Sequence, residues 1–241
     1  MEREILRRFV DVVASGVGLV LLSPLFAAVA ISIKVTGRGP VFFRQERVGL
    51  HGTEFSIYKF RTMVVDAAHG GSGITVGGDV RVTRVGRFLR RFKIDELPQL
   101  INVLRGEMTL VGPRPELPQY VAKFCDAYEP ILRLRPGITH RASILYRDEE
   151  ELLAAVPDPE RFYVEEIMPT KLRLYTRDLD RDGFRQDVLT ILQTLACVAR
   201  ISTETRSRQS VKTRRPVPRG PKRAPALAAR QAVAGGRVTV A

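Results

Sequence analysis

The chain is 241 residues long, with a formal net charge of +13 and 44% hydrophobic residues. This length allows one catalytic domain with material left over at both ends, and the positive charge favours an anionic partner. The cysteines and histidines are few and isolated, namely Cys125, Cys197, His51, His69 and His140. Their spacing argues against a zinc site or a disulfide framework, and we expect each histidine at the surface or in a loop.

An apolar segment without a charge runs from Val12 to Ile33 and is long enough in principle to cross a bilayer. Basic residues flank it on both sides, with Arg7 and Arg8 before it and Lys34 and Arg38 after it. Because basic flanks tend to stay on the cytoplasmic side, both ends are drawn toward the cytoplasm. Asp11 lies just before the segment, where we expect water at the membrane interface to hydrate it.

Ser23 and Pro24 stand near the middle of this segment. Proline lacks a backbone N–H and clashes with the preceding turn, so we expect a break into two half-helices, each reaching about 16 Å. Two such halves would enter and leave the same leaflet as a re-entrant hairpin. The Ser23 hydroxyl could meet a backbone group freed at the break. A straight span with a proline kink is the alternative.

Residues 41–63 predict two strands around a turn at 49–52, because aromatic and β-branched residues flank a glycine-containing turn. Lys59 and Arg61 alternate with aromatic residues and are therefore expected on one face of the second strand. They form either a solvated edge or a pair of contacts for phosphate oxygens.

A short helix is predicted next, because Val85, Phe88, Leu89 and Phe92 recur at helical spacing. Basic residues occupy its remaining faces. Such a helix either lies on a membrane surface with its basic side toward the headgroups, or packs in a core with a solvated back.

Asp95 and Glu96 lie side by side between two groups of cations. Upstream are Arg84, Arg87, Arg90, Arg91 and Lys93, and downstream Arg114 stands between two prolines that restrict its backbone. A carboxylate kept ionised among cations is the form that attacks an electrophile or holds a divalent metal ion. Arginines suit the binding of phosphate oxygens. In the alternative interpretation Asp95 caps a helix that ends at Gly106, and the two roles are compatible.

Further helices are predicted at 149–156, 159–177 and 184–201. From residue 203 onward the chain is rich in Pro, Ala, Gly and Arg and carries ten Lys or Arg against one acid. Such a segment cannot bury enough apolar area to order itself. It is either a solvated extension without a function or a segment that binds anionic lipid headgroups through its charge.

These elements predict an α+β fold that is mainly helical, with a small β-hairpin and surface amphipathic helices. We expect three regions along the chain. They are a membrane-associated re-entrant helix-hairpin (1–38), a catalytic domain (39–202) and a disordered basic tail (203–241).

Taken in order, these segments resemble the bacterial sugar transferases, which are monotopic polyprenol-phosphate phosphoglycosyl transferases. Five blocks carry the resemblance: the apolar segment with Ser23-Pro24, and then residues 39–49, 58–63, 83–90 and 95–115. An ordered series of blocks is more specific than any single motif. Beyond Pro115 the similarity is looser, and residues 140–150 depart from the run that many family members carry. This difference in sequence leaves the catalytic blocks intact. It weakens any inference about which sugar is transferred.

The resemblance, to the small form of the family, implies transfer of a phospho-sugar from a nucleotide (UDP-) sugar to polyprenol (undecaprenyl) phosphate. The membrane would be the bacterial inner membrane, with the catalytic domain on its cytoplasmic side. The nucleophilic aspartate falls on Asp95, its partner glutamate on Glu96 and the phosphate-binding arginine on Arg114. Further candidates for phosphate contact are Lys59, Arg61 and Arg90. Asp95 and Glu96 would also hold Mg²⁺, which suits carboxylates and substrate phosphates better than zinc does.

The product would initiate the assembly of exopolysaccharide, capsule, O-antigen or a glycoprotein glycan, with later-acting glycosyltransferases as partners. No nucleic acid is expected, because no aromatic residues interleave with the charges of the tail. One alternative is a non-enzymatic membrane-bound adaptor with a basic docking surface, which gives no reason for an acidic pair among arginines. Another is hydrolysis or transfer of a lipid-linked phosphate through a metal-activated water.

Overall fold

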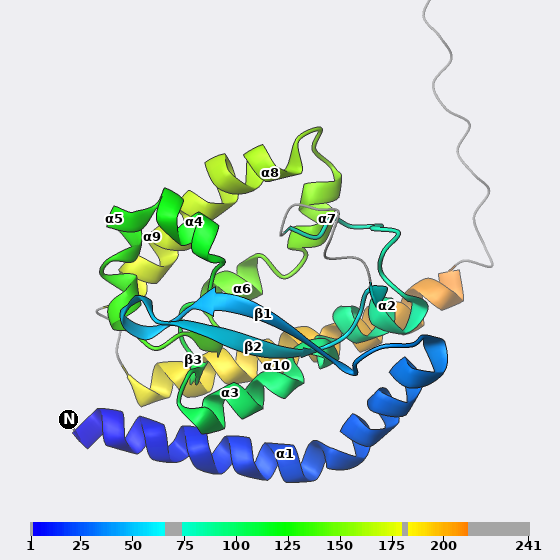
Figure 1. The fold of residues 1–241 in the computed structure, drawn as a ribbon, viewed down its shortest axis with the longest axis horizontal. Coiled ribbons are helices and arrows are strands. Elements are labelled where there is room, and N and C mark those ends of the chain that lie inside the picture. The colour runs from blue at the N-terminus through cyan, green and yellow to red at the C-terminus, as the bar shows by residue number, and fades with distance from the viewer. Residues whose placement is uncertain (1, 66–73, 180–182, 212–241) are drawn as a thin grey trace, which may run out of the picture. The chain divides into compact units, whose positions relative to one another are not determined.

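The structure, a computed structural model, describes residues 2–65, 74–179 and 183–211 (Figure 1). It is mainly helical, with a small antiparallel sheet and one long apolar helix at the N-terminus. The mainly helical α+β class predicted from the sequence is therefore confirmed. Of the predicted basic tail, residues 212–241 lie outside the described residues, as does His69.

The elements are mostly short. The strands are β1 (Phe42–Val48), β2 (Glu54–Phe60), β3 (Thr109–Val111) and β4 (Gly137–Thr139). The α-helices are α1 (Glu2–Thr36), α2 (Arg84–Arg91), α3 (Leu100–Arg105), α4 (Pro118–Lys123), α5 (Cys125–Tyr128), α6 (Arg141–Leu145), α7 (Glu149–Ala154), α8 (Pro159–Phe162), α9 (Met168–Asp178) and α10 (Phe184–Val211). Tighter or wider helical turns are η1 (Leu50–Gly52), η3 (Ile94–Gln99), η4 (Ile131–Arg133) and the π-helical η5 (Tyr163–Ile167).

The N-terminal segment forms one helix, α1, which is long and apolar enough to cross a membrane and is largely exposed. Figure 1 shows it bent, and Pro24 stands inside it. The Ser23 hydroxyl donates a hydrogen bond to the carbonyl oxygen of Val20 (2.7 Å). That carbonyl lies four residues before Pro24, so a residue with an N–H at position 24 would have bonded it. The serine replaces the missing donor, as predicted. The helix runs through Ser23-Pro24 without the predicted break, and the re-entrant path stays a prediction.

Polar contacts anchor the start of α1. Asp11 is buried and accepts hydrogen bonds from the Thr109 hydroxyl (2.6 Å) and the Leu110 N–H (3.1 Å). The expectation that water hydrates Asp11 is therefore wrong, because β3 supplies both donors. Arg8 donates to two carbonyl groups in the last turn of α3, where the helix dipole favours a cation.

The predicted hairpin is confirmed. Strands β1 and β2 pair antiparallel, from Phe42 opposite Phe60 to Val48 opposite Glu54. The connecting turn lies at the predicted place, and His51 in it has a φ of 55°. In the view of Figure 1, α1 lies on one side of the hairpin and α7 and α8 lie on the other.

A second, parallel pair of strands, β3 and β4, was not predicted, because each strand has only three residues. Gly112 directly follows β3, and Gly137 begins β4. A Cβ atom added to Gly137 would lie 2.0 Å from the backbone nitrogen of Gly112. Only glycine permits this approach, and it fixes the chain after β3 against the chain before β4.

The largest buried apolar cluster joins α4 to α9 and is rich in tyrosine; its members include Tyr120, Tyr128, Tyr163, Ile167 and Tyr175. His140 lies between β4 and α6, so the expected loop position is confirmed, but it is buried beside the Tyr175 ring (4.9 Å between ring centroids) and not at the surface. Its Nδ1 accepts a hydrogen bond from the Ala142 N–H and thereby caps α6.

One side of α2 faces a smaller apolar cluster. Leu89 packs there with Val29, Ile33 and Phe60, whereas the side chain of Phe88 is exposed. The prediction that this helix packs in a core is therefore confirmed for the side that carries Leu89. Contact of its other side with a membrane surface stays a prediction.

Candidate active site

Asp95 and Glu96 lie in the first turn of η3, directly after α2 ends. Lys93 adopts a left-handed backbone conformation (φ 55°, ψ 21°), which turns the chain between the two helical pieces. Lys93 also occupies the cap position of η3, so the interpretation of Asp95 as a helix cap is wrong. Both carboxylates are buried, with 6% and 9% of their residue surface exposed.

Glu96 is neutralised by two cations. Arg114 donates from both terminal nitrogens, Nη1 to Oε2 (3.0 Å) and Nη2 to Oε1, and the Lys59 Nζ lies 3.1 Å from Oε1. Burial by itself would raise the pKa of Glu96, but Arg114 and Lys59 outweigh burial and hold this pKa well below its usual value. Glu96 is therefore a permanent anion with little remaining capacity to accept a proton.

Asp95 differs from Glu96 in the direction of its pKa shift and in its hydrogen bonding. Burial and the adjacent Glu96 charge raise the pKa of Asp95, although Lys59 opposes them. Its Oδ1 is buried and has no hydrogen-bond partner among the described residues. A buried polar atom without a partner is unusual in folded proteins. This carboxylate thus has an oxygen that no side chain or backbone group of residues 2–65, 74–179 and 183–211 engages.

Arg114 is positioned by backbone packing. It follows Gly112 and Pro113, and the Gly137 N–H donates to the Pro113 carbonyl (2.8 Å). A Cβ atom on Gly112 would lie 2.6 Å from the Arg135 carbonyl oxygen. The close contact fixes the turn that carries Arg114, and the flanking prolines restrict it further.

Arg90 and Arg61 do not pair with Glu96 but with other parts of the protein. Arg90 donates from Nε to the Thr62 hydroxyl (2.9 Å) and from Nη1 to Glu150 (2.8 Å), and its charge acts on Asp95. Arg61 donates to the carbonyls of Arg38 (2.7 Å) and Gly37 (3.0 Å), just beyond the end of α1.

Of the residues predicted from the sequence, the structure thus brings together Asp95, Glu96, Lys59 and Arg114, with Arg90 close enough to act through its charge. Arg61 makes no hydrogen bond to either carboxylate within the described part of the chain. Ser23 and Pro24 lie in α1.

A second buried acidic group was missed. Glu116 accepts from Arg47 (3.0 Å) at Oε1 and from the Tyr163 hydroxyl (2.6 Å) at Oε2. Arg47 lies in one of the blocks that carry the family resemblance, and Glu116 directly follows another. No local pattern pairs them with Tyr163, which comes from η5.

Asp95 and Glu96 are the residues of this site whose chemistry suits a magnesium ion. The described residues contain no group of three or more His, Cys, Asp or Glu side chains that could hold a metal ion. Asp95 and Glu96 offer two carboxylates, one of them with an oxygen that has no described partner. Mg²⁺ is commonly held by one or two carboxylates together with substrate phosphates and water, so these residues fit that ion.

The sequence was compared with known proteins. A family model described as bacterial sugar transferase matches residues 2–200. A UDP-N-acetylgalactosamine-undecaprenyl-phosphate N-acetylgalactosaminephosphotransferase of Aeromonas hydrophila is 43% identical over 145 residues, which cover 58% of this chain and 34% of the relative. An undecaprenyl-phosphate glucose phosphotransferase of Komagataeibacter xylinus is 46% identical over 145 residues, which cover 57% and 27%.

A third relative is closer in length. The putative undecaprenyl-phosphate N-acetylgalactosaminyl 1-phosphate transferase of Bacillus subtilis (strain 168) is 42% identical over 136 residues, which cover 56% of this chain and 72% of the relative. The match therefore spans most of that relative but only 34% and 27% of the other two. Because the family model matches well over half of the chain, the protein belongs to the bacterial sugar transferase family.

Proposed function

We propose that this protein transfers a phospho-sugar from a nucleotide sugar, such as a UDP-sugar, to a polyprenol phosphate. The names of the relatives describe phosphotransferases that act with undecaprenyl phosphate. The observation that carries the proposal is the difference between two adjacent buried carboxylates. Glu96 is neutralised by two cations, whereas Asp95 keeps an oxygen without a hydrogen-bond partner among the described residues.

The first step uses the Asp95 carboxylate as a nucleophile. Its oxygen forms a bond to the sugar-linked phosphorus, and the bond from that phosphorus to the bridging oxygen breaks. The bridging oxygen keeps the electron pair and leaves on the nucleoside monophosphate. In the second step an oxygen of the polyprenol phosphate bonds to the same phosphorus, the bond to Asp95 breaks, and the carboxylate is restored.

The surrounding residues support these steps in different ways. Glu96 holds Lys59 and Arg114 beside Asp95, so positive charge stays close to the reacting phosphorus. Lys93 and Arg90 add further positive charge, whose attraction opposes the rise in the pKa of Asp95 caused by burial and Glu96. Fixed cations stabilise the charge that develops on phosphoryl oxygens during transfer.

We also propose a magnesium requirement. Asp95 and Glu96 would hold the ion together with donor phosphates, and the bound ion would neutralise diphosphate charge. Arg114 and Lys59 are already engaged by Glu96 and compensate that charge only in part.

The largely exposed, apolar α1 provides the attachment to the bilayer. We propose that it follows a re-entrant path in the bacterial inner membrane, with the catalytic residues on the cytoplasmic side at headgroup depth. The lipid phosphate lies at that depth, whereas the nucleotide sugar arrives from solution. The product would then be extended by later-acting glycosyltransferases in exopolysaccharide, capsule, O-antigen or glycoprotein glycan assembly.

The test is the intact-protein mass after incubation with a panel of UDP-sugars and Mg²⁺, for wild type and Asp95→Asn in detergent. We expect wild type to gain the mass of one phospho-sugar with the correct donor, and the adduct to disappear when polyprenol phosphate is added. Asp95→Asn should gain nothing, because an amide keeps the shape but is a far weaker nucleophile.

Two outcomes would contradict the proposal. An adduct of equal size in Asp95→Asn would remove Asp95 from the nucleophilic role. Absence of both adduct and released nucleoside monophosphate in wild type, with every donor and with polyprenol phosphate present, would favour a membrane-bound adaptor.

A further inference from the structure

Among the described residues, Lys59, Lys93 and Arg90 act on the Asp95 carboxylate through their charge. Lys59 is paired with Glu96, and the side chains of both are largely buried (17% and 12% exposed). Arg90 is paired with Glu150, whose side chain is 46% exposed. Arg90 therefore differs from Lys59, because the carboxylate that neutralises it is accessible to water.

This difference in exposure decides which pair separates more easily. Arg90 itself is 20% exposed, so the difference lies in Glu150: when this pair separates, water solvates the released carboxylate. When a buried pair separates, an unsolvated charge remains inside the protein. An incoming anion can thus take Arg90 from Glu150 far more readily than it can take Lys59 or Arg114 from Glu96.

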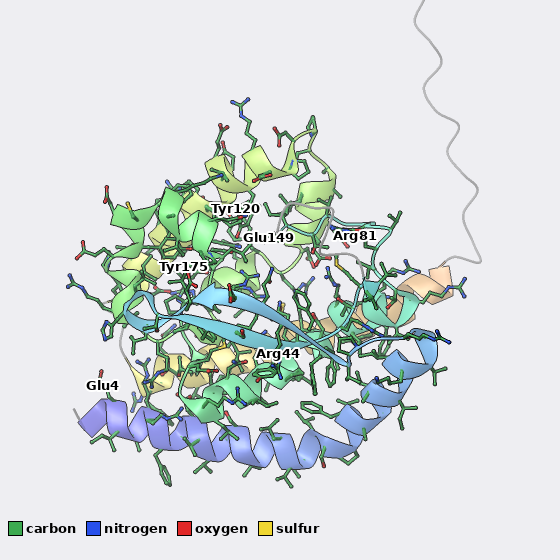
Figure 2. All side chains as sticks on the ribbon, in the orientation of Figure 1. Glu4, Arg44, Arg81, Tyr120, Glu149 and Tyr175 are labelled. Carbon is green, nitrogen blue, oxygen red and sulfur yellow. The ribbon has the colours of Figure 1, made fainter. Side chains whose placement is uncertain are left out.

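The backbone at Glu150 is held by a hydrogen bond, whereas nearly half of the Glu150 side chain is exposed to water. The Gly77 N–H donates to the Glu150 carbonyl oxygen (2.7 Å), and a Cβ atom on Gly77 would lie 2.9 Å from that oxygen. In Figure 2 the neighbouring Glu149 and Arg81 lie on the same side of the β1–β2 hairpin, opposite α1. On the other side of Arg90, the Nε bond to the buried Thr62 holds the guanidinium in place.

We propose that Glu150 is a displaceable counter-ion for Arg90. A diphosphate group that arrives beside Asp95 takes over the N–H group that Glu150 occupies in the free protein. Because Glu150 competes with the bound anion, it weakens donor binding, and it returns to Arg90 when the second step has removed the phospho-sugar from Asp95. The inference rests on the proposed function, since it requires a diphosphate group at Asp95.

Glu150 lies in the stretch 140–150, where this chain departs from the run that many members of its family carry. Glu150 lies outside the blocks 83–90 and 95–115, which carry Arg90, Asp95, Glu96 and Arg114. It adjusts how tightly a donor binds without changing the groups that react.

The experiment compares Glu150→Gln with Glu151→Gln in the full chain. Glu151 is exposed on the same helix, and its substitution changes the net charge by the same amount. The readout is the dissociation constant of pyrophosphate, which presents a diphosphate group without sugar or base. We expect Glu150→Gln to bind pyrophosphate about two- to fivefold more tightly than wild type, as expected for the loss of an exposed competing pair. Glu151→Gln should bind as wild type does.

If both variants bound pyrophosphate more tightly by the same factor, the change in net charge would explain the effect. That result would overturn the inference. Unchanged or weaker binding in Glu150→Gln would also overturn it, because a supporting role predicts weaker binding. The donor KM supplies a second readout and should fall in Glu150→Gln without a gain in kcat.

These outcomes separate the two proposals. Tighter pyrophosphate binding by Glu150→Gln, with neither adduct nor released nucleoside monophosphate in wild type, would sustain the counter-ion and reject the proposed transfer. An adduct in wild type with identical pyrophosphate binding in the two variants would reject the counter-ion alone.

Discussion

Glu96 and Glu116 are both buried glutamates, and each is paired with an arginine at 3.0 Å. Burial opposes ionisation in both, yet the nearby cations lower the pKa of each, with Arg114 and Lys59 acting on Glu96 and Arg47 acting first on Glu116. By burial, charge pairing and pKa the two residues look alike. Only their neighbours distinguish them.

Both carboxylate oxygens of Glu116 are engaged by the protein. Oε1 accepts from Arg47 and from the Leu117 N–H (2.9 Å), and Oε2 accepts from Tyr163. Beside Glu96 stands Asp95, with a buried oxygen that no described residue satisfies. A buried ion pair by itself therefore does not identify a reactive site. An unsatisfied acceptor next to a neutralised carboxylate is the more specific sign.

The largest expected effect on stability comes from removing either glutamate. Glu96→Gln leaves Lys59 and Arg114 without their carboxylate, and Glu116→Gln does the same to Arg47. We expect each to lower the free energy of unfolding by about 3 to 5 kcal/mol, as is usual when one partner of a buried pair is removed. Urea unfolding in detergent measures this change in the free energy of unfolding.

The same two variants should separate in activity. Glu116→Gln should still form the phospho-sugar adduct at close to the wild-type rate per folded molecule, whereas Glu96→Gln should lose it. A folded Glu116→Gln protein without adduct would place Glu116 in the reaction and remove the distinction drawn here.

Asp95→Asn should have the opposite effect on stability. Because the pKa of Asp95 is raised, folding favours its neutral form, and at neutral pH the charged form costs stability. We expect the amide to raise the free energy of unfolding by about 0.5 to 2 kcal/mol, a range common for relieving a destabilised active-site group. The gain should shrink as pH falls, because wild-type Asp95 then becomes neutral too. A less stable variant at neutral pH would contradict this account.

The pH dependence of activity and stability should also differ. Adduct formation needs ionised Asp95, so its rate should fall as pH drops through a pKa above the ordinary 3.8. Glu96 and Glu116 have lowered pKa values, so their contribution to stability is present above the ordinary 4.5 and is lost only as pH falls toward the lower folded values. Activity should therefore fail at a higher pH than the fold does. Adduct rate and Tm measured across the same pH series test this.

A smaller loss of stability than that of the two glutamate variants is expected from Tyr163→Phe. The substitution removes the hydroxyl that donates to Glu116 Oε2 but leaves Arg47 in place. We expect a loss of about 1.5 kcal/mol, the lower range for a hydrogen bond to a charged group, and an unchanged adduct rate. A loss of stability as large as that of Glu116→Gln would show that Tyr163, and not Arg47, accounts for most of the stability that Glu116 contributes.

Local features were predictable from the sequence. The hairpin, the neighbouring acidic pair and the Ser23 contact each depend on residues that are close together along the chain. The alternation rule placed Lys59 and Arg61 on one face, but β2 ends at Phe60. Arg61 lies beyond the strand, where alternation no longer applies, and it reaches the end of α1.

Long-range contacts were not predictable in this way. Asp11 was expected in water, yet β3 lies against it and supplies two donors. The pairs between Arg90 and Glu150 and between Glu116 and Tyr163 join residues far apart in sequence, and no periodicity relates them. A single sequence indicates which side chains are chemically capable, but packing decides which of them meet.

The contact between Gly112 and Gly137 also bears on how this protein can change in length. Because the two glycines hold the ends of the intervening chain together, residues 118–133 form a loop that is closed at its base. Lengthening a closed loop costs little extra entropy. The exposed connection at Glu129, between α5 and η4, can therefore accept inserted residues without entering either helix, while Arg114, held at the base, keeps its place beside Glu96.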